Sequence, residues 1–263
     1  MSLARRHRDR ILAAQTVAFV PNGGVATAPA AAPLPAAGAV NASPADRAAA
    51  QIGLRMTHDL RRLKEIRSIG LKVSTKRTML PEYRDWIAGI LAADAGVGTG
   101  LAADVLPTCM VWSIDTGDYD YALNLAEFVL RHRVALPKRY ERDAATLIVE
   151  EIADQAIKAQ NANERFPLAV LERVQDLTFA DDIHDQVRAK LLKAIGVEIL
   201  TDAQDMEADA AKVELTSALS ALREAQRLHD RIGVKDKIKR AEKTLAAIVA
   251  ATPATEQGGD TAA

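Results

Sequence analysis

The sequence has little of what secreted and membrane proteins depend on. Cys109 is the only cysteine among 263 residues, so no internal disulfide can form and a reducing compartment is expected. This cysteine lies in an apolar run, which predicts a buried thiol. The charge-free segment from 11 to 45 contains five prolines, so no stretch is long and apolar enough to cross a membrane. Basic residues before the apolar segment 11–20 mimic a secretion signal, but Asp9, Gln15 and Thr16 interrupt that pattern.

Phosphate-binding and metal-binding motifs are also absent from the sequence. A nucleotide-driven motor requires a glycine-rich loop that follows a strand and ends in Gly-Lys-Ser/Thr. The loop from Gly96 to Gly100 has neither a predicted strand before it nor this ending. The five histidines lack the spacing of a zinc site. Aspartates at 115, 118 and 120, and at 181, 182 and 185, fit turns and helix starts better than a magnesium site. We therefore expect no cofactor and no metal, and no catalytic residue can be named.

Charge is divided unevenly along the chain, although the net charge is only −1. Residues 1–80 carry 13 basic and 4 acidic residues, whereas residues 81–263 carry 21 basic and 31 acidic residues. A basic block of this size indicates contact with a polyanion, and the acidic remainder would be repelled by it. An ordinary solvated helix surface is the alternative, since Asp59 and Glu65 lie within pairing reach of several arginines. The candidate DNA-binding residues are Arg5, Arg6, Arg8, Arg10, Arg55, Arg61, Arg62, Lys64, Arg67, Lys72, Lys76 and Arg77.

Apolar residues recur with helical periodicity throughout, which predicts an all-α fold of helical hairpins behind a disordered Ala/Pro-rich N-terminal linker. We expect a basic N-terminal arm over 1–19 and the linker over 20–43. An N-terminal helical domain with a basic face is expected over 44–133, a C-terminal helical domain over 134–250 and a disordered tail over 251–263. The hairpins at 101–133 and 207–250 have lengths typical of helical repeats, but they share no repeated sequence signature.

Several helix limits are predicted from caps and prolines. Ser43 and Pro44 favour a helix start. We expect Gly70 to end that helix, a basic connector to follow it, and Pro81 to open the next helix. Gly117 suits a left-handed helix end and Asp118 a cap. Further helices are predicted at 143–160, 166–178, 185–203, 207–229 and 234–250.

Two groups of apolar side chains are expected to pack inside the protein or at a subunit interface. A stripe on the helix after Pro44 predicts self-association or packing on the domain, and it consists of Ile52, Met56, Leu60, Leu63 and Ile66. The aromatic residues Tyr83, Trp86 and Trp112 share the helical phase of their apolar neighbours, which favours a core or interface position over stacking on bases.

Three stretches carry a resemblance to a known family. They are Lys76-Arg77-x-x-Leu80-Pro81-x-Tyr83-x-x-Trp86-x-x-Gly89; Thr108-x-Met110-Val111-Trp112-x-Ile114-Asp115-Thr116-Gly117-Asp118, with Ala122-Leu123; and Asp185-x-Val187-Arg188-Ala189-Lys190-Leu191. In this order and spacing they resemble the terminase small subunit of peduovirus-like temperate contractile-tailed phages, which is traditionally called the terminase endonuclease subunit.

The resemblance implies a role in starting genome packaging. Such a subunit binds double-stranded phage DNA at the cohesive-end (cos) site and delivers it to a large subunit with the ATPase and nuclease. A homo-oligomeric ring, and location in the cytoplasm of the infected bacterial host, are implied as well. The acidic C-terminal half is then expected to contact the large subunit or the procapsid machinery. Two alternatives stay open: a metal-dependent endonuclease that cuts the cos site itself, and a helical-repeat adaptor that binds only protein.

Overall fold

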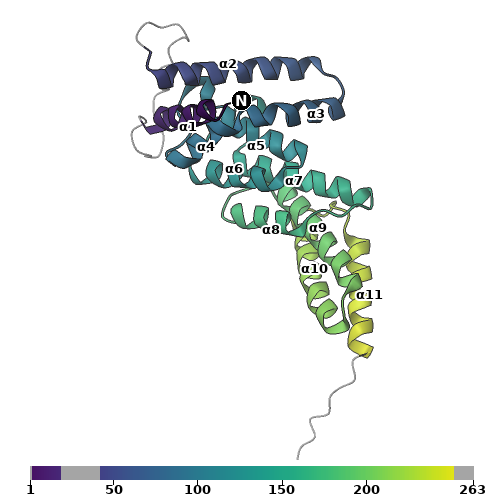
Figure 1. Ribbon diagram of the computed structural model, residues 1–263. Helices are drawn as coiled ribbons and strands as arrows, with labels where there is room; N and C mark the ends of the chain where they lie inside the picture. Colours follow the sequence, from purple (N-terminus) through teal and green to yellow (C-terminus); the bar gives the residue numbers. More distant parts are fainter. Residues whose placement is uncertain (1, 19–41, 252–263) are drawn as a thin grey trace, which may run out of the picture. The chain divides into compact units, whose positions relative to one another are not determined.

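The computed structural model describes residues 2–18 and 42–251, and these residues contain helices and loops but no strand (Figure 1). The helices are α1 (Leu3–Ala18), α2 (Pro44–Glu65), α3 (Ile69–Met79), α4 (Arg84–Ala93), α5 (Val105–Thr116), α6 (Tyr119–Arg131), α7 (Ala144–Asn161), α8 (Leu168–Leu177), α9 (Asp185–Asp202), α10 (Ala208–Leu228) and α11 (Lys235–Ala251). Short 3-10 turns are η1 (Leu80–Glu82), η2 (Gly100–Ala102), η3 (Lys138–Tyr140) and η4 (Ala203–Asp205). The predicted all-α class is confirmed, and each of the five helices predicted after residue 140 lies within two residues of its predicted limits.

The chain divides into two compact units, 1–151 and 152–263, with the division inside α7. The predicted domains at 44–133 and 134–250 are segments expected to fold independently. The division into compact units does not test this, so they stay a prediction. The predicted linker over 20–43 and tail over 251–263 lie almost entirely outside the described residues.

In the first unit, α2 starts as its sequence predicts. The Ser43 hydroxyl accepts from the Asp46 backbone N–H at 3.0 Å, and the Asp46 carboxylate accepts from the Ser43 N–H at 3.1 Å. This reciprocal cap satisfies two donors that a helix start leaves free. Met56 and Leu63 of the predicted stripe are buried, and the other stripe residues are half-buried, so this stripe packs on its own unit.

The predicted end of α2 at Gly70 is wrong, and so is the basic connector after it. Helix α2 ends at Glu65, and α3 begins at Ile69 after a short extended segment. The Ser68 hydroxyl accepts from the Leu71 N–H at 3.3 Å and caps α3, so Gly70 lies inside its first turn. A serine cap restarts the helix here because it satisfies a free N–H group.

Helix α1 packs on α4 through a glycine. A Cβ at Gly89 would lie 2.2 Å from the Arg10 carbonyl oxygen and 2.8 Å from the Ala13 Cβ, so only glycine permits this separation. Ala13 and Val17 are the fully buried residues of α1 for which the structure describes the side chain. The predicted N-terminal arm is therefore a helix that docks on the unit through a small apolar contact.

Helices α5 and α6 supply much of the first unit's core. Cys109 is fully buried, as predicted, and burial raises the pKa of its thiol well above the usual range. Gly117 has the predicted left-handed backbone, with φ of 79°. Asp118 occupies the N-cap position of α6, as predicted, but its carboxylate makes no capping hydrogen bond and pairs with Arg84 at 2.9 Å instead. Pro81, predicted to open the next helix, lies in η1 just before α4.

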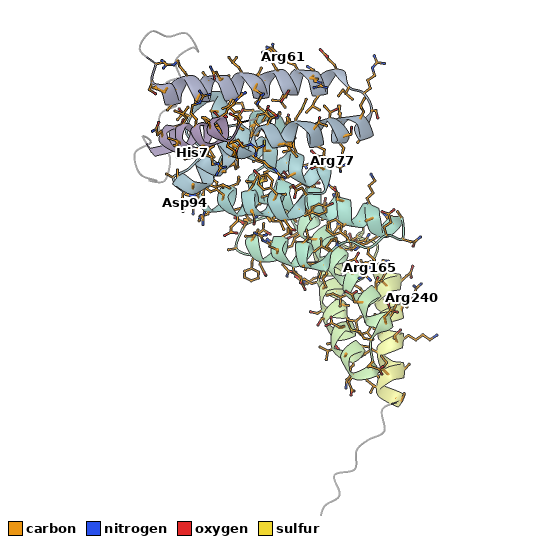
Figure 2. The ribbon with its side chains drawn as sticks, viewed as in Figure 1. His7, Arg61, Arg77, Asp94, Arg165 and Arg240 are labelled. Atoms are coloured by element: carbon orange, nitrogen blue, oxygen red, sulfur yellow. The ribbon has the colours of Figure 1, made fainter. Side chains whose placement is uncertain are left out.

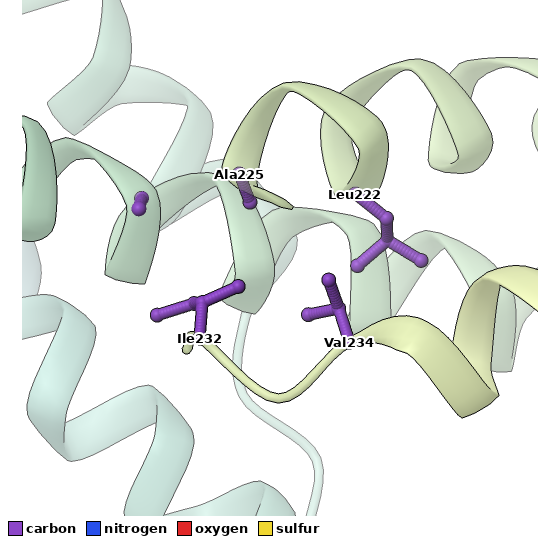
Figure 3. Close-up of a cluster of buried hydrophobic side chains, with 5 residues drawn as sticks. Leu222, Ala225, Ile232 and Val234 are labelled. Carbon is purple, nitrogen blue, oxygen red and sulfur yellow. The ribbon is translucent and has the colours of Figure 1, made fainter. Parts of the chain in front are cut away.

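The second unit is built on the antiparallel helices α9 and α10, with α11 against α10. Gly196 permits their close approach, since a Cβ there would meet the Leu222 side chain at 2.7 Å. Leu222, Ala225, Ile232 and Val234 form a buried cluster at one end of the α10–α11 hairpin (Figure 3).

A buried carboxylate connects α9 to the segment before α8. Glu198 is 1% exposed and accepts from Arg165 at 2.8 Å and from Gln160 at 2.9 Å. These donors offset the cost of burying its charge.

Candidate nucleic-acid interface

The hairpin of α2 and α3 carries the densest group of predicted DNA-binding residues (Figure 1). We define the hairpin tip as residues 58–72, which include the end of α2, the connector and the start of α3. Its cations are Arg61, Arg62, Lys64, Arg67 and Lys72. Four of them are exposed and Lys72 is half-buried. Figure 2 shows Arg61 on α2.

The five cations of the hairpin tip make no side-chain hydrogen bond and no ion pair with any residue that the structure describes. The acidic residues of the tip do not neutralise them. Asp59 accepts from the Tyr83 hydroxyl at 2.6 Å, and burial together with this bond raises the pKa of Tyr83 above its usual range, so the hydroxyl stays a donor. Glu65 is exposed and pairs with none of the five. The tip therefore presents free positive charge to solvent.

The predicted basic residues of α1 lie among carboxylates. Arg6 and Arg10 lie 3.7 and 3.4 Å from Asp85 of α4. Arg5 and Arg8 each lie 3.9 Å from Asp9. These contacts reduce the positive potential of α1, so α1 and the hairpin tip do not form one uniform cationic face.

The remaining predicted residues are also engaged. Arg55 pairs with Glu82 at 3.0 Å, and Lys76 pairs with Asp115 at 2.5 Å. Arg77 donates to the Thr116 carbonyl at 2.9 Å, so α3 is held to the end of α5 (Figure 2 labels Arg77). The ion pairs of Asp115 with Lys76 and of Asp118 with Arg84 give these two aspartates structural roles.

A second group of free cations lies on α11 and was not predicted from the sequence. Lys235, Lys237, Lys239, Arg240 and Lys243 are all exposed, and none makes an ion pair within the described chain (Figure 2 labels Arg240). The excess of acidic residues after residue 80 concealed this group. The signal was present in the spacing, because residues 235, 239 and 243 repeat every four residues and share one helix face.

The three aromatic candidates are buried, as predicted. Tyr83, Trp86 and Trp112 are 0%, 4% and 2% exposed, and the rings of Tyr83 and Trp112 meet edge to face at 6.1 Å. None of the three is available to stack on a base.

Residues 2–18 and 42–251 hold no group of three or more His, Cys, Asp or Glu side chains arranged to bind a metal ion. The same residues include no helix with the length and apolar character needed to span a membrane.

Comparison with known proteins places residues 53–186 in a single family model, that of the phage small terminase subunit. The chain belongs to the phage small terminase subunit family. This membership gives it a role in phage genome packaging and confirms the resemblance drawn from its sequence.

Two curated relatives support the assignment of this small terminase subunit. It is 34% identical over 195 residues to the "Terminase, endonuclease subunit" of Escherichia phage P2, covering 74% of this chain and 73% of that protein. It is 24% identical over 149 residues to the "Probable terminase, endonuclease subunit" of Haemophilus phage HP1, covering 55% of this chain and 53% of that protein. No solved structure matches it.

The family match includes the whole hairpin tip of this small terminase subunit. It leaves out the arginines of α1 and the cations of α11.

Proposed function

We propose that this small terminase subunit binds double-stranded phage DNA at the packaging site through its hairpin tip and delivers it to the large subunit with the ATPase and nuclease. The observation that carries the proposal is the group of free cations at the tip. Arginine and lysine side chains that already pair with carboxylates must give up those partners to bind phosphate, whereas the tip cations lose only water and counterions.

The size of this group is sufficient for measurable affinity. Each phosphate that a cation neutralises contributes about 0.9 to the slope of log affinity against log salt concentration. Five contacts from one subunit give a slope of about −4.5. We propose further that the subunit works as a homo-oligomeric ring, in which several copies acting together raise the effective concentration.

The location and partners of the subunit follow from this role. DNA packaging by terminase is proposed to take place in the cytoplasm of the infected host, and the large subunit is proposed to contact the second unit. The predicted α2 stripe is occupied inside the first unit, so self-association requires other apolar side chains.

The test compares two variants that lose the same charge. In the tip variant, Arg61, Arg62, Lys64, Arg67 and Lys72 are all changed to glutamine, which is a good helix former. In the matched control, the α11 cations Lys235, Lys237, Lys239, Arg240 and Lys243 are changed to glutamine. Fluorescence anisotropy with a labelled cos-containing duplex at low salt gives the affinity of each.

We expect the tip variant to lose at least a hundredfold in affinity and the α11 control to lose less than fivefold, because the tip lies within the residues that match the family and α11 does not (about 1 kcal/mol is fivefold). Equal losses of affinity in both variants would mean that DNA binding depends only on the total charge of the protein, which would refute the proposal. Native affinity in the tip variant would refute it as well. Undetectable binding by the native protein would instead favour the protein-only adaptor.

The endonuclease alternative is tested with the same duplex. Incubation of the native protein with Mg²⁺ and the cos duplex is expected to leave the DNA uncut. Cleavage that Asp115→Ala or Asp185→Ala abolishes would replace our proposal with that alternative.

A further inference from the structure

The loop between α8 and α9 presents an aromatic ring to solvent. Phe179 is 78% exposed, and it is the one aromatic side chain among the exposed large apolar residues that the structure describes. The loop around it is fixed, because the Arg188 guanidinium donates to the carbonyl oxygens of Thr178 and Asp181 at 2.9 and 3.0 Å. The buried side chains of Thr178 and Ile183 lie on either side of the ring in the sequence and anchor it. Phe179 is therefore held in advance in the position of an interface anchor, a role in which aromatic side chains are enriched.

The same loop carries negative charge that no other described residue neutralises. We define the Phe179 loop as residues 178–185, which end with the first residue of α9. Its carboxylates, those of Asp181, Asp182 and Asp185, are exposed and make no ion pair with any residue that the structure describes. A surface that receives this loop therefore has to be apolar at its centre and positively charged beside it.

A groove with an apolar floor lies between α10 and α11 of the same unit, and we call it the α10–α11 groove (Figure 1). Its volume is about 470 Å³. Its apolar walls are Leu219, Leu245, Ala246, Val249 and Ala250. Val249 is 51% exposed, so this apolar surface is open to solvent and has room for a large side chain.

Free lysines continue this surface along α11. Lys235, Lys239 and Lys243 follow one another every four residues, and Ala246 comes three residues later, so all four share one face of the helix. The three lysines are exposed and make no ion pair within the described chain. The groove and its lysines thus have the apolar character and the charge that the Phe179 loop requires of its partner.

The loop and the groove of one chain are too far apart to meet. The groove shares Leu219 and Leu245 with a cluster that includes Ala203, just past the last residue of α9. The Phe179 loop precedes α9, whose 18 residues make it about 27 Å long. Because the loop is fixed at both ends, it cannot cross most of that length to reach the groove of its own chain.

The segment after α11 does not suit the groove either. Residues 252–263 contain no Leu, Ile, Val, Met or aromatic residue, so they offer no large side chain for an apolar floor. A second copy of the chain, in contrast, brings both an exposed aromatic ring and three free carboxylates.

We propose that the Phe179 loop of one subunit docks into the α10–α11 groove of a second copy of this chain. Phe179 lies on the apolar floor, and the loop carboxylates lie beside Lys239 and Lys243. Each subunit uses two different surfaces, so the contact is head-to-tail and repeats from copy to copy until a ring closes. This inference rests on the homo-oligomeric ring of the proposed function and names its contacts, but it does not depend on DNA contact at the hairpin tip.

Sedimentation velocity of the full chain without DNA, over about a hundredfold range of protein concentration, is the first test. Native protein is expected to form assemblies larger than a dimer as its concentration rises. Phe179→Ser is expected to weaken assembly at least about tenfold, the effect of losing one buried aromatic side chain. Ile69→Ser is the matched control, because Ile69 is also 78% exposed but lies at the hairpin tip, and it should assemble like the native chain.

The charges of the loop are tested by reversal. Asp181→Lys combined with Asp182→Lys brings positive charge against the lysines of α11, and it is expected to weaken assembly about tenfold at low salt. Native assembly in this variant would contradict the charge complementarity that favours a second copy as the partner.

Mixing two defective variants tests the head-to-tail geometry. The groove variant carries Ala246→Glu and Val249→Glu, both at exposed helix positions where glutamate is a good helix former. It keeps a native Phe179 loop, whereas Phe179→Ser keeps a native groove. Each variant alone is expected to stay monomeric at concentrations where native protein assembles. Their mixture is expected to form a dimer of one copy of each and nothing larger, since only one loop and one groove remain intact.

Three results would overturn the proposal: a native chain that stays monomeric, native assembly in Phe179→Ser or in the groove variant, and a mixture that stays monomeric. If the native chain is monomeric but the groove variant fails to bind the large subunit, the groove belongs to that partner instead. Circular dichroism melting shows whether each variant is folded. If the groove variant is not, Ala250→Glu replaces it with the same expected and refuting results.

Failure of this contact and failure of DNA binding give different results. Phe179→Ser keeps every tip cation, so each bound subunit should keep the native salt dependence of duplex binding. The tip variant keeps the loop and the groove, so it should assemble like the native chain. The α11 control variant keeps Phe179 and the apolar floor, and it should lose less than about fivefold in assembly, because exposed ion pairs contribute little.

Discussion

Substitution of Gly89 by alanine tests whether α1 is a docked element of the first unit. The new Cβ would lie 2.2 Å from the Arg10 carbonyl oxygen, a backbone atom that cannot move without its helix. Alanine normally stabilises a helix relative to glycine by about 1 kcal/mol. Here the clash reverses that preference, because α1 has to shift or leave α4.

The contacts of α1 decide which of these happens. The fully buried Val17 and Ala13 contribute roughly 2–3 kcal/mol to docking. The ion pairs of Arg6 and Arg10 with Asp85 are largely exposed and contribute at most about 1 kcal/mol. Overpacking typically costs about 1–3 kcal/mol, which is comparable to the whole docking energy. We therefore expect α1 to detach while the rest of the unit stays folded.

Amide hydrogen exchange measures this detachment directly. In Gly89→Ala, a docking loss of about 2 kcal/mol accelerates exchange in α1 about thirtyfold, with little change in α5 and α6. Gly70→Ala is the control, because the nearest atom to its new Cβ lies 4.0 Å away. It should leave α1 unchanged and stabilise α3 slightly. Native protection of α1 in Gly89→Ala would refute the packing argument.

Three further predictions concern single side chains. Tyr83→Phe removes the hydroxyl that donates to Asp59 and should lower the free energy of unfolding by about 1–3 kcal/mol in urea denaturation; no change would mean that this bond contributes nothing. Burial alone raises the pKa of Asp143, but hydrogen bonds from Thr146 and the start of α7 outweigh it, so the pKa lies below its usual value of 3.8. Asp143→Ala should therefore lower the free energy of unfolding by about 1 kcal/mol near neutral pH. This loss should shrink as the pH falls below 3.8 towards the pKa of the folded protein. An equal loss at pH 3 and pH 7 would contradict the assigned role of the carboxylate. Glu198→Ala removes the acceptor of the Arg165 Nε–H and of the Phe166 backbone N–H, although Arg165 keeps its contact with Asp202, and should destabilise the second unit by about 1–3 kcal/mol, more than the exposed control Glu207→Ala; similar losses in both would refute it.

Local patterns predicted the helical fold well because their causes are local. The Ser43 cap with Pro44 depends on residues within one turn, and so does the left-handed Gly117. The buried aromatic residues Tyr83 and Trp112 follow from helical phase. In each case, neighbours in the sequence are also the neighbours that determine the structure.

The pairing of charges was not predictable from the sequence, because the partners are far apart in it. Arg6 and Arg10 meet Asp85 only when α1 docks on α4, and Asp118 meets Arg84 rather than capping its own helix. A count of charges over residues 1–80 therefore overstated the continuous basic surface. The charge counted over residues 81–263 is acidic in total, and it concealed the free cations of α11.

Neutralisation of DNA phosphates by the hairpin tip is tested most directly by the salt dependence of duplex binding. Affinities of the native protein and the tip variant are measured by anisotropy from 50 to 500 mM NaCl. We expect the slope of log affinity against log salt to become less steep by about 4.5 per bound subunit in the tip variant, which is about 0.9 for each of the five lost phosphate contacts. A slope that is the same in both proteins would show that the tip cations do not contact DNA, and would contradict the account.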